Sequence, residues 1–340
     1  MNSTWEKFGA ASIDISGKAD KTDTVLSTTL SRGRKSNTTV GTGSFAFGSY
    51  VEASGHCSHA EGSGTIASGI NSHAEGIGGT YAKNGTTYTS GAKGDADHAE
   101  GYKCLTENGL QGNHAEGYQT RATGGAAHSE GQSTVASGFC SHAEGQGTKA
   151  TNDFTHAEGQ YTEANNAFSH AEGCNTIADG VGSHVEGQYT TAAGASSHVS
   201  GQYNVKDSYS NWPEWVANTS YSVGDKVKRT SGSSMSGYIC KTENSDSTFT
   251  SSKWIAQNGK MNYAEIIGNG TANEALSNAR VLDWDGNEHL KGDLYVGCNS
   301  DSTGGTKLAR IPDPPTTDGT YTLQATVVSG VITYTWIAGA

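Results

Sequence analysis

Small and polar residues alternate in a short phrase that recurs through the middle of the chain. The phrase His-Ala-Glu-Gly places an Ala between two polar side chains and ends in Gly. Because alternate residues of a strand face opposite sides of a sheet, Ala is predicted to point inward, and His and Glu to point outward. The Gly supplies the backbone freedom that a tight reversal requires. The pattern therefore predicts a short strand followed by a turn.

The phrase is repeated with a regular period. Seven copies are whole, and looser copies begin at His128, His184 and His198. From His114 to His198 the histidines recur every fourteen residues, and ten of the twelve histidines belong to the series, so any account of function must explain it first. The histidines and glutamates of the whole copies are His59, Glu61, His73, Glu75, His98, Glu100, His114, Glu116, His142, Glu144, His156, Glu158, His170 and Glu172.

Each fourteen-residue unit divides into two halves of seven. The division is clearest where Ala60-Glu61-Gly62 is followed by Ala67-Ser68-Gly69. One half holds a strand and a turn, so two halves predict one coil of a β-solenoid. Coils stack at about 4.8 Å, and the eleven or so coils of residues 42–204 predict a rod of roughly 50 Å.

Two irregular steps interrupt the ladder. The step from His73 to His98 is 25 residues, and its extra residues include Asn84-Gly85 between strand formers, which predicts a small protruding hairpin. The step from His98 to His114 is sixteen, which indicates a two-residue loop extension. Insertions in solenoids map to loops, often on the binding face.

Ser-His-Ala-Glu-Gly followed by Ala-Ser-Gly resembles the head repeat of YadA-type trimeric adhesins, over about half of the chain. The resemblance implies a homotrimer of left-handed parallel β-rolls with fourteen residues per coil. It also implies that the alternate positions, His and Glu here, point toward neighbouring chains. This sequence departs from the commonest adhesin version, which carries Val and Ile at those positions.

The outward histidines and glutamates allow two interpretations. A His of one chain that donates to a Glu of the next would satisfy both groups and set the register of three chains. Equivalent histidines around a threefold axis would instead offer nitrogen ligands to zinc, nickel or iron. Because a Glu accompanies the His in every whole copy, we favour the hydrogen-bonded network and expect no metal or other cofactor. The recurring Ser-His pair is not a catalytic triad, which is one pre-organised constellation.

Residues 205–258 have a different, aromatic composition. The arrangement Trp, Tyr-x-x-Gly-Asp-x-Val, Tyr-x-Cys, Trp resembles the small chitin- or cellulose-binding module attached to bacterial chitinases. The resemblance implies three short strands with exposed aromatic residues that stack on sugar rings. The alternative is that the aromatic residues fill the core of a very small domain. The candidate carbohydrate-binding residues are Trp212, Trp215, Tyr221, Tyr238 and Trp254.

The C-terminal stretch, residues 259–340, is again strand-like. Asp285-Gly286 between two apolar runs predicts a hairpin, and Tyr321–Val327 with Val331–Trp336 predicts a second one. The phrase that starts at Asn278 resembles segments near the end of phage tail-fibre and prophage structural proteins. Two carboxylates in a cleft would suit a glycan depolymerase, with Asp283, Asp285 and Glu288 as candidates, but a turn explains these residues better.

Composition and charge limit the classes of partner and the compartment that we expect for this chain. A net charge of −12 without a basic stripe argues against nucleic-acid binding. The six cysteines form no Cys-x-x-Cys pair, which favours free thiols and a reducing compartment. The N-terminus has no secretory signal, and no apolar run reaches the length of a membrane span, so we expect no membrane insertion.

These observations predict an all-β chain, a trimeric left-handed parallel β-roll followed by small β domains. The expected segments are a connector or attachment segment (1–41), the roll (42–204), the carbohydrate-binding-like module (205–258) and a β tip (259–340). The predicted function is a non-enzymatic structural and receptor-binding tail fibre of a phage or phage-like particle, with host-surface glycan and other tail or baseplate proteins as partners. It would assemble in the bacterial cytoplasm and act in the virion. A bacterial cell-surface trimeric adhesin and a glycan depolymerase are the alternatives.

Overall fold

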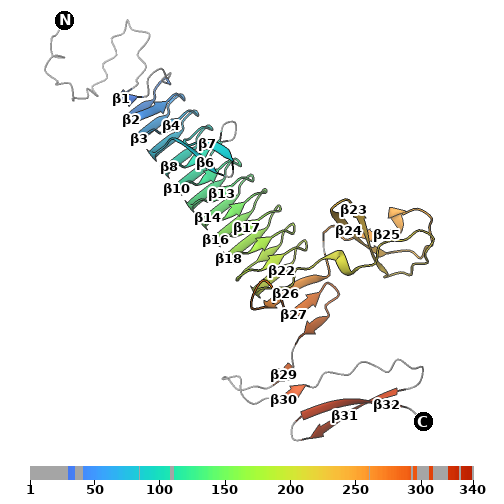
Figure 1. The fold of residues 1–340 in the computed structure, drawn as a ribbon. Coiled ribbons are helices and arrows are strands. Elements are labelled where there is room, and N and C mark those ends of the chain that lie inside the picture. Colours follow the sequence, from blue (N-terminus) through green and yellow to red (C-terminus); the bar gives the residue numbers. More distant parts are fainter. Residues whose placement is uncertain are drawn as a thin grey trace, which may run out of the picture.

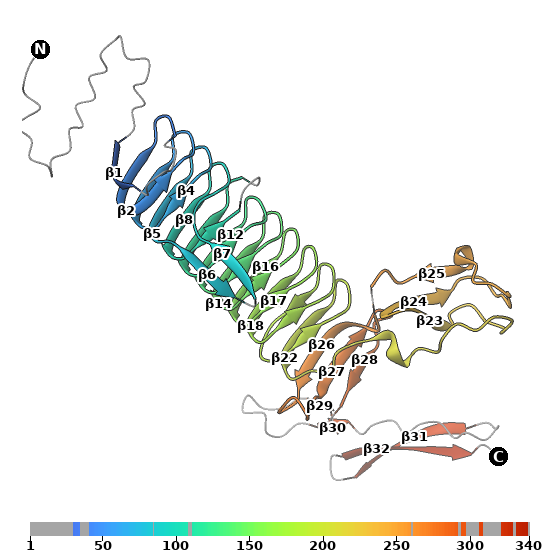
Figure 2. The ribbon, with the colours of Figure 1, turned by 45° about the horizontal axis from the view of Figure 1, so that its top comes forward.

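The computed structural model describes residues 30–34, 41–83, 85–107, 111–259 and 261–291, and four C-terminal strands within 294–338. Its main body is a parallel β-solenoid of about 11 turns with about 14 residues per turn, and small β units follow (Figure 1). The coils stack as regular rungs along one axis (Figure 2). The predicted fold class is therefore confirmed for the single chain. Most of the predicted connector, residues 1–29 and 35–40, lies outside the described residues.

One long parallel sheet contains the His-Ala-Glu-Gly strands. Each strand pairs in register with its equivalent in the next coil, so that His114 lies beside His128 and Glu116 beside Glu130. The sheet starts at β1 (Leu30–Arg34) and β2 (Phe45–Ala53). It continues through β3 (His59–Ser63), β5 (His73–Ile77), β8 (His98–Tyr102), β10 (His114–Tyr118), β12 (His128–Gln132), β14 (His142–Gln146), β16 (His156–Gln160), β18 (His170–Cys174), β20 (His184–Val185) and β22 (His198–Gln202).

The second half of most coils contributes a two-residue strand. Apart from β4 (Ile66–Ala67), which pairs with β2, these strands form a sheet of their own. That sheet comprises β9 (Leu105–Thr106), β11 (Arg121–Ala122), β13 (Val135–Ala136), β15 (Lys149–Ala150), β17 (Glu163–Ala164), β19 (Ile177–Ala178) and β21 (Thr191–Ala192). From β8 to β22 the strands of the two sheets thus alternate along the chain.

The interior of the solenoid is filled by very small side chains. Ala143 on the long strand and Ala150 on the short strand are fully buried, and equivalent alanines recur in most coils. A Ser or Thr usually precedes the histidine and is also buried, and its hydroxyl donates to a backbone carbonyl, as Ser141 Oγ does to Gly138 O at 2.7 Å. Several of these buried hydroxyls are thus satisfied locally, whereas the hydroxyl of Ser169 and those of Thr120, Thr148, Thr162 and Thr176 have no partner in the described chain.

The backbones of successive coils approach so closely that some positions admit only Gly. A Cβ added at Gly145 would lie 2.1 Å from the carbonyl oxygen of Gly159, and the φ of Gly145 is +101°. Both conditions exclude an L side chain. The Gly of the phrase is therefore needed for coil stacking as well as for the turn.

The irregular steps leave the register intact. β5 pairs with β8, and β8 with β10, with histidine beside histidine in each case. The first insertion forms the predicted hairpin of β6 (Thr80–Lys83) and β7 (Thr86–Thr89), whose turn residue Asn84 lies outside the described residues. In the enlarged coils Asp97 replaces the buried Ser, and its carboxylate accepts from the backbone amides of Gly94 and Asn113, each at 2.8 Å.

The aromatic module is an insertion between two neighbouring strands of the long sheet. The repeat pattern predicts that the roll ends at residue 204. In the structure the long sheet continues, because β22 pairs in parallel with β26 (Tyr263–Asn269). Ile266 lies beside Val199 and is buried. β27 (Asn278–Asp283) and β28 (Glu288–Leu290) then extend the sheet in antiparallel fashion. Residues 205–262 therefore leave the solenoid and return to it.

The module is a three-stranded antiparallel sheet of β23 (Lys226–Ser231), β24 (Ser234–Cys240) and β25 (Trp254–Ala256). Two short 3-10 helices, η2 (Tyr209–Asn211) and η3 (Ser251–Lys253), accompany it. It projects sideways from the end of the rod (Figures 1 and 2). The last sheet contains β29 (Leu294–Val296), β30 (Thr306–Leu308) and the predicted terminal hairpin of β31 (Tyr321–Val328) and β32 (Val331–Ala338).

Candidate functional site

The ten histidines of the repeat form one continuous column on the outer face of the long sheet. Neighbouring rings from His59 to His198 lie 4.5 to 5.0 Å apart between centroids, and most pairs are parallel within 6°. The separation equals the spacing of paired strands, so the stacking follows from the strand register. The inward Ala and the outward His and Glu are as predicted from the alternation.

A parallel column of glutamates accompanies the histidines. In eight coils the histidine Nε2 lies 3.4 to 3.9 Å from an Oε2 atom of the glutamate two residues later, as His98 does from Glu100 at 3.4 Å. These separations exceed those of good hydrogen bonds, so the pairs interact electrostatically rather than by full hydrogen bonds. All sixteen side chains are roughly one-third exposed.

The Nε2 atoms of the column lack a hydrogen-bond partner within the described chain. Nine of them, in the histidines of the series from His59 to His184, are buried without such a partner. A buried polar atom normally has a partner, and an unmade bond costs roughly 1–3 kcal/mol. The face that contains the column is therefore incomplete in the single chain.

At four positions of the column the surroundings disfavour protonated histidine. Partial burial, followed by repulsion from a neighbouring histidine, lowers the pKa of His59, His98, His170 and His184 below its usual value. The adjacent glutamates raise the pKa but act more weakly. These four rings therefore favour the neutral form.

The column also brings potential metal ligands together. In five groups of two histidines and one glutamate, such as His98, Glu100 and His114, the ligand atoms lie within 4.8 Å of one another. A metal lies close to the plane of each imidazole that binds it, and the planes of two parallel stacked rings do not meet. His98 and His114, whose rings are parallel within 2°, would have to rotate to share one ion. The observed geometry therefore suits hydrogen bonding to a neighbour better than chelation.

The aromatic residues of the module mostly pack against one another. Trp254 is 5 % exposed and forms a core with Val227 and Cys240, against which Trp215, Tyr221, Tyr238 and Phe249 pack. Trp212 is 7 % exposed, packs against Tyr209 and donates from Nε1 to Asn262 Oδ1 at 2.5 Å. Neither Trp212 nor Trp254 presents a free ring face to a sugar. Trp215, Tyr221 and Tyr238 are half-buried and remain the candidates.

The three carboxylates considered for hydrolysis lie at a hairpin turn. Asp283 accepts from the backbone amides of Asp285 and Asn287 at 3.0 and 2.8 Å, and Glu288 pairs with Arg280. These contacts hold the turn between β27 and β28. The five cysteines that the structure describes form no disulfide.

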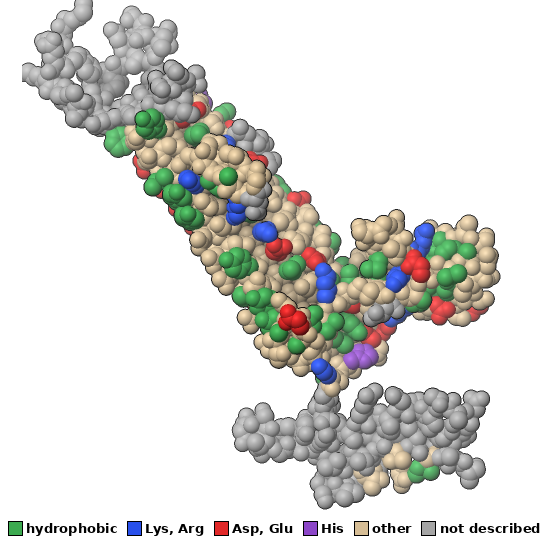
Figure 3. Space-filling model, viewed as in Figure 1, with side chains coloured by type: hydrophobic (Ala, Val, Ile, Leu, Met, Phe, Trp, Pro, Cys, Tyr) green, Lys and Arg blue, Asp and Glu red, His purple; other side chains and the backbone are tan. Residues whose placement is uncertain are grey.

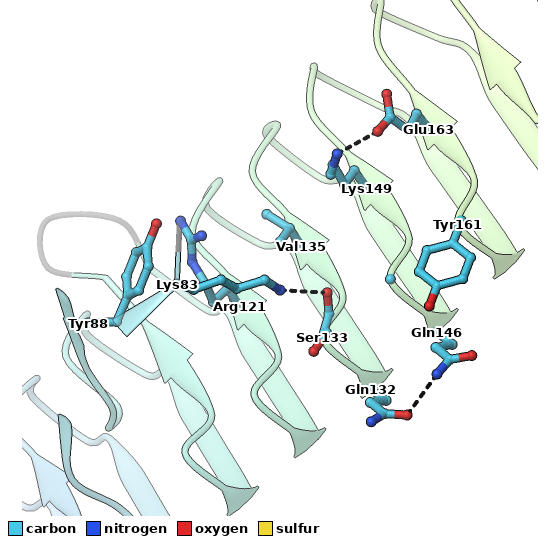
Figure 4. Close-up of a pocket in the computed structure, with 11 residues that line it drawn as sticks. Lys83, Tyr88, Arg121, Gln132, Ser133, Val135, Gln146, Lys149, Tyr161 and Glu163 are labelled. Carbon is cyan, nitrogen blue, oxygen red and sulfur yellow. Dashed lines mark hydrogen bonds and ion pairs between the residues drawn. The ribbon is translucent and has the colours of Figure 1, made fainter. Parts of the chain in front are cut away.

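Sequence reasoning did not single out a groove beside the hairpin β6–β7. It is lined by Lys83, Tyr88, Arg121, Lys149 and Tyr161, among others (Figure 4). The 25-residue step between His73 and His98 predicts the hairpin. Only the fold shows that the hairpin lies beside later coils, whose groove-lining residues are up to about 80 positions away in the sequence.

Comparison with known proteins adds no identification. No protein-family model matches the chain, and no curated protein matches it. None of the helical segments in the described part of the chain has the length and apolarity that a bilayer crossing requires.

Proposed function

We propose that this chain is a structural and receptor-binding subunit of a phage or phage-like tail fibre, and that three copies associate side by side through the histidine column. The observation that carries the proposal is the incomplete outer face of an otherwise regular rod. A long sheet that carries a partly exposed column of stacked histidine rings beside a column of glutamates, with their hydrogen bonds incompletely made, has the properties of an interface between like surfaces.

The rod itself suits a spacer. About 11 turns in unbroken register hold the two ends of the rod at a fixed distance from each other. The interior is filled mainly by Ala, Ser and Thr and leaves no room for a ligand. Binding chemistry is therefore expected on the outside and at the appended units. In this proposal the module contributes a contact to host-surface glycan through Trp215, Tyr221 or Tyr238, and other tail or baseplate proteins hold the fibre.

A bacterial surface adhesin would use the same rod. The two assignments differ in where the protein resides. A labelled antibody against the purified chain distinguishes them, because it would bind released particles if the chain is a fibre protein and intact producing cells if it is an adhesin. A fibre protein is expected on particles.

The trimer is tested by native mass measurement, with an expected mass of three times the 35.2 kDa of one chain. A matched pair of variants tests the interface. His142→Asp places a second carboxylate beside Glu144 in the column and is expected to weaken the trimer, whereas Lys149→Asp on the short-strand sheet of the same coil is expected to leave it intact. A monomer at micromolar concentration would contradict the proposal, because the rod would then have to function alone.

A further inference from the structure

The groove beside the hairpin β6–β7 combines cationic, amide and aromatic side chains in one place. Its volume is about 540 Å³, within the range of about 300–1,000 Å³ that is typical of small-ligand sites. The hairpin supplies Lys83 and Tyr88, and the short strands of four successive coils supply Arg121, Val135, Lys149 and Glu163 (Figure 4).

The groove has an excess of positive charge in a chain whose net charge is −12. Lys83, Arg121 and Lys149 line it, and the only carboxylate among its described lining residues is Glu163, which pairs with Lys149. Burial, and then the proximity of Arg121 and Lys149, lowers the pKa of Lys83. The cations therefore repel one another, and an anion between them would relieve that repulsion.

Arg121 is held in place but only partly satisfied. Its guanidinium lies over the ring of Tyr88, 4.1 Å from the centroid, and its Nε atom is buried without a hydrogen-bond partner in the described chain. Lys83 reaches only a backbone carbonyl, that of Ser133, at 3.4 Å. Both groups retain donors for a ligand, and a guanidinium fixed on an aromatic ring is well suited to carboxylate recognition.

The other side of the groove suits a sugar ring. Tyr161 is 52 % exposed, and its ring lies so close to Gly147 that a Cβ there would be 2.6 Å from a ring carbon. The amides of Gln132 and Gln146 lie beside it and are joined by a hydrogen bond of 3.1 Å. Side-chain amides both donate and accept, which matches hydroxyl groups, while an aromatic face matches the apolar face of a pyranose.

From these contacts we propose that the groove binds an acidic oligosaccharide, with Arg121 and Lys83 at its carboxylate and Tyr161 against a sugar ring. This rests on the proposed receptor-binding function and adds a glycan site in the shaft, apart from the module. The groove lies where the short strands meet the C-terminal ends of β12 and β14 of the long sheet, which supply Gln132 and Gln146, whereas the histidines stand at the first position of those strands. No histidine or glutamate of the column lines the groove. On the face shown in Figure 3, Lys and Arg side chains and Asp and Glu side chains are both spaced along the rod, among mostly uncharged ones.

The test is calorimetric titration of the full chain with hexagalacturonate, with its methyl ester as a neutral probe of the same shape. Hexagalacturonate is expected to bind, with affinity that falls as salt rises, and the ester is expected not to bind. Arg121→Gln and Tyr161→Ala should each weaken binding by about tenfold or more. Lys241→Gln, an exposed cation of the module, is the matched control and should bind as the native chain does.

Several results would overturn the assignment. Equal binding of the methyl ester would remove the role of charge. Equal binding of hexaglutamate would assign the groove to acidic peptides, and full competition by inorganic phosphate would reduce it to a simple anion site. Cell adsorption of the purified protein is measured in parallel. Adsorption that persists in Arg121→Gln, without binding of hexagalacturonate to the native chain, would reject the groove and leave the proposed function standing.

Discussion

The side chains of Asp207 and Asn262 join the two ends of the inserted module, although 55 residues separate them. The carboxylate accepts from the backbone amide and from the side-chain amide of Asn262, both at 2.7 Å, and also from the backbone amide of Tyr263 at 2.9 Å. Asp207 is 6 % exposed. This buried connection brings the chain back to the solenoid at the correct position for β26.

Replacement of this carboxylate tests the connection. Asp207→Ala leaves several donors unpaired and is expected to lower the free energy of unfolding by about 2–3 kcal/mol. Limited proteolysis should then cut the chain at the base of the module faster than in the native protein. Glu243→Ala, an exposed carboxylate of the module, is the control and should change neither measurement. Unchanged proteolysis in Asp207→Ala would show that the connection does not hold the module.

Coil stacking depends on Gly145. Gly145→Ala brings a Cβ to 2.1 Å from the carbonyl oxygen of Gly159, so the two coils must separate, and circular dichroism should show a large fall in Tm or failure to fold. The control is Gly79→Ala, since Gly79 also has a positive φ, +117°, but nothing within 4 Å of the added atom. Similar effects of both substitutions would attribute the loss to backbone strain alone.

The histidine column predicts loss of stability in acid. An unfolded histidine takes up a proton near pH 6.5, whereas the pKa of His59, His98, His170 and His184 is lower in the folded chain. Below about pH 6.5 the unfolded state therefore binds more protons, and stability falls until the folded pKa is passed. Well above about pH 6.5 these histidines are neutral in both the folded and the unfolded state, so their effect on stability disappears.

The measurement is Tm between about pH 8 and about pH 5, which should decline in the native chain. His98→Gln and His170→Gln should each reduce the slope. His289→Gln serves as control because His289 lies outside the column and its side chain is 61 % exposed. A Tm that is flat over this range, or equal slopes in all variants, would contradict the prediction.

The core of the module depends on Trp254. This side chain packs against Tyr221 and Phe249, with ring centroids 5.1 and 5.4 Å away. Trp254→Ala is expected to cost about 3–5 kcal/mol, which a unit of this size does not tolerate. The module should unfold while the solenoid keeps its strand signal. The thermal transition followed by tryptophan fluorescence should then occur at a lower temperature than the transition followed by circular dichroism. Trp284→Ala, 37 % exposed and outside the module, should leave both transitions in place.

Much of the architecture follows from the sequence because strand alternation and the Gly positions are local properties. His, Ala, Glu and Gly each have one role in a coil of fourteen residues, so the inward Ala, the outward His and Glu and the hairpin at residues 80–89 could be predicted. The same pattern predicts that the roll ends at residue 204, whereas the long sheet continues into β26. Tyr263–Asn269 lacks the phrase, and a periodic pattern does not continue across an insertion of more than fifty residues.

Only the tertiary structure decided where the side chains of different coils meet. It stacked the histidine rings into one column, because the strand spacing sets the distance between them. It buried Trp254 in the core of the module, with other aromatic rings packed against it, and it buried Trp212 against Tyr209. It also placed Lys83 of the hairpin near Arg121 and Tyr161. Sequence alone thus determined the repeat and the direction of each side chain, while long-range packing determined which surfaces are complete and which remain open to a partner.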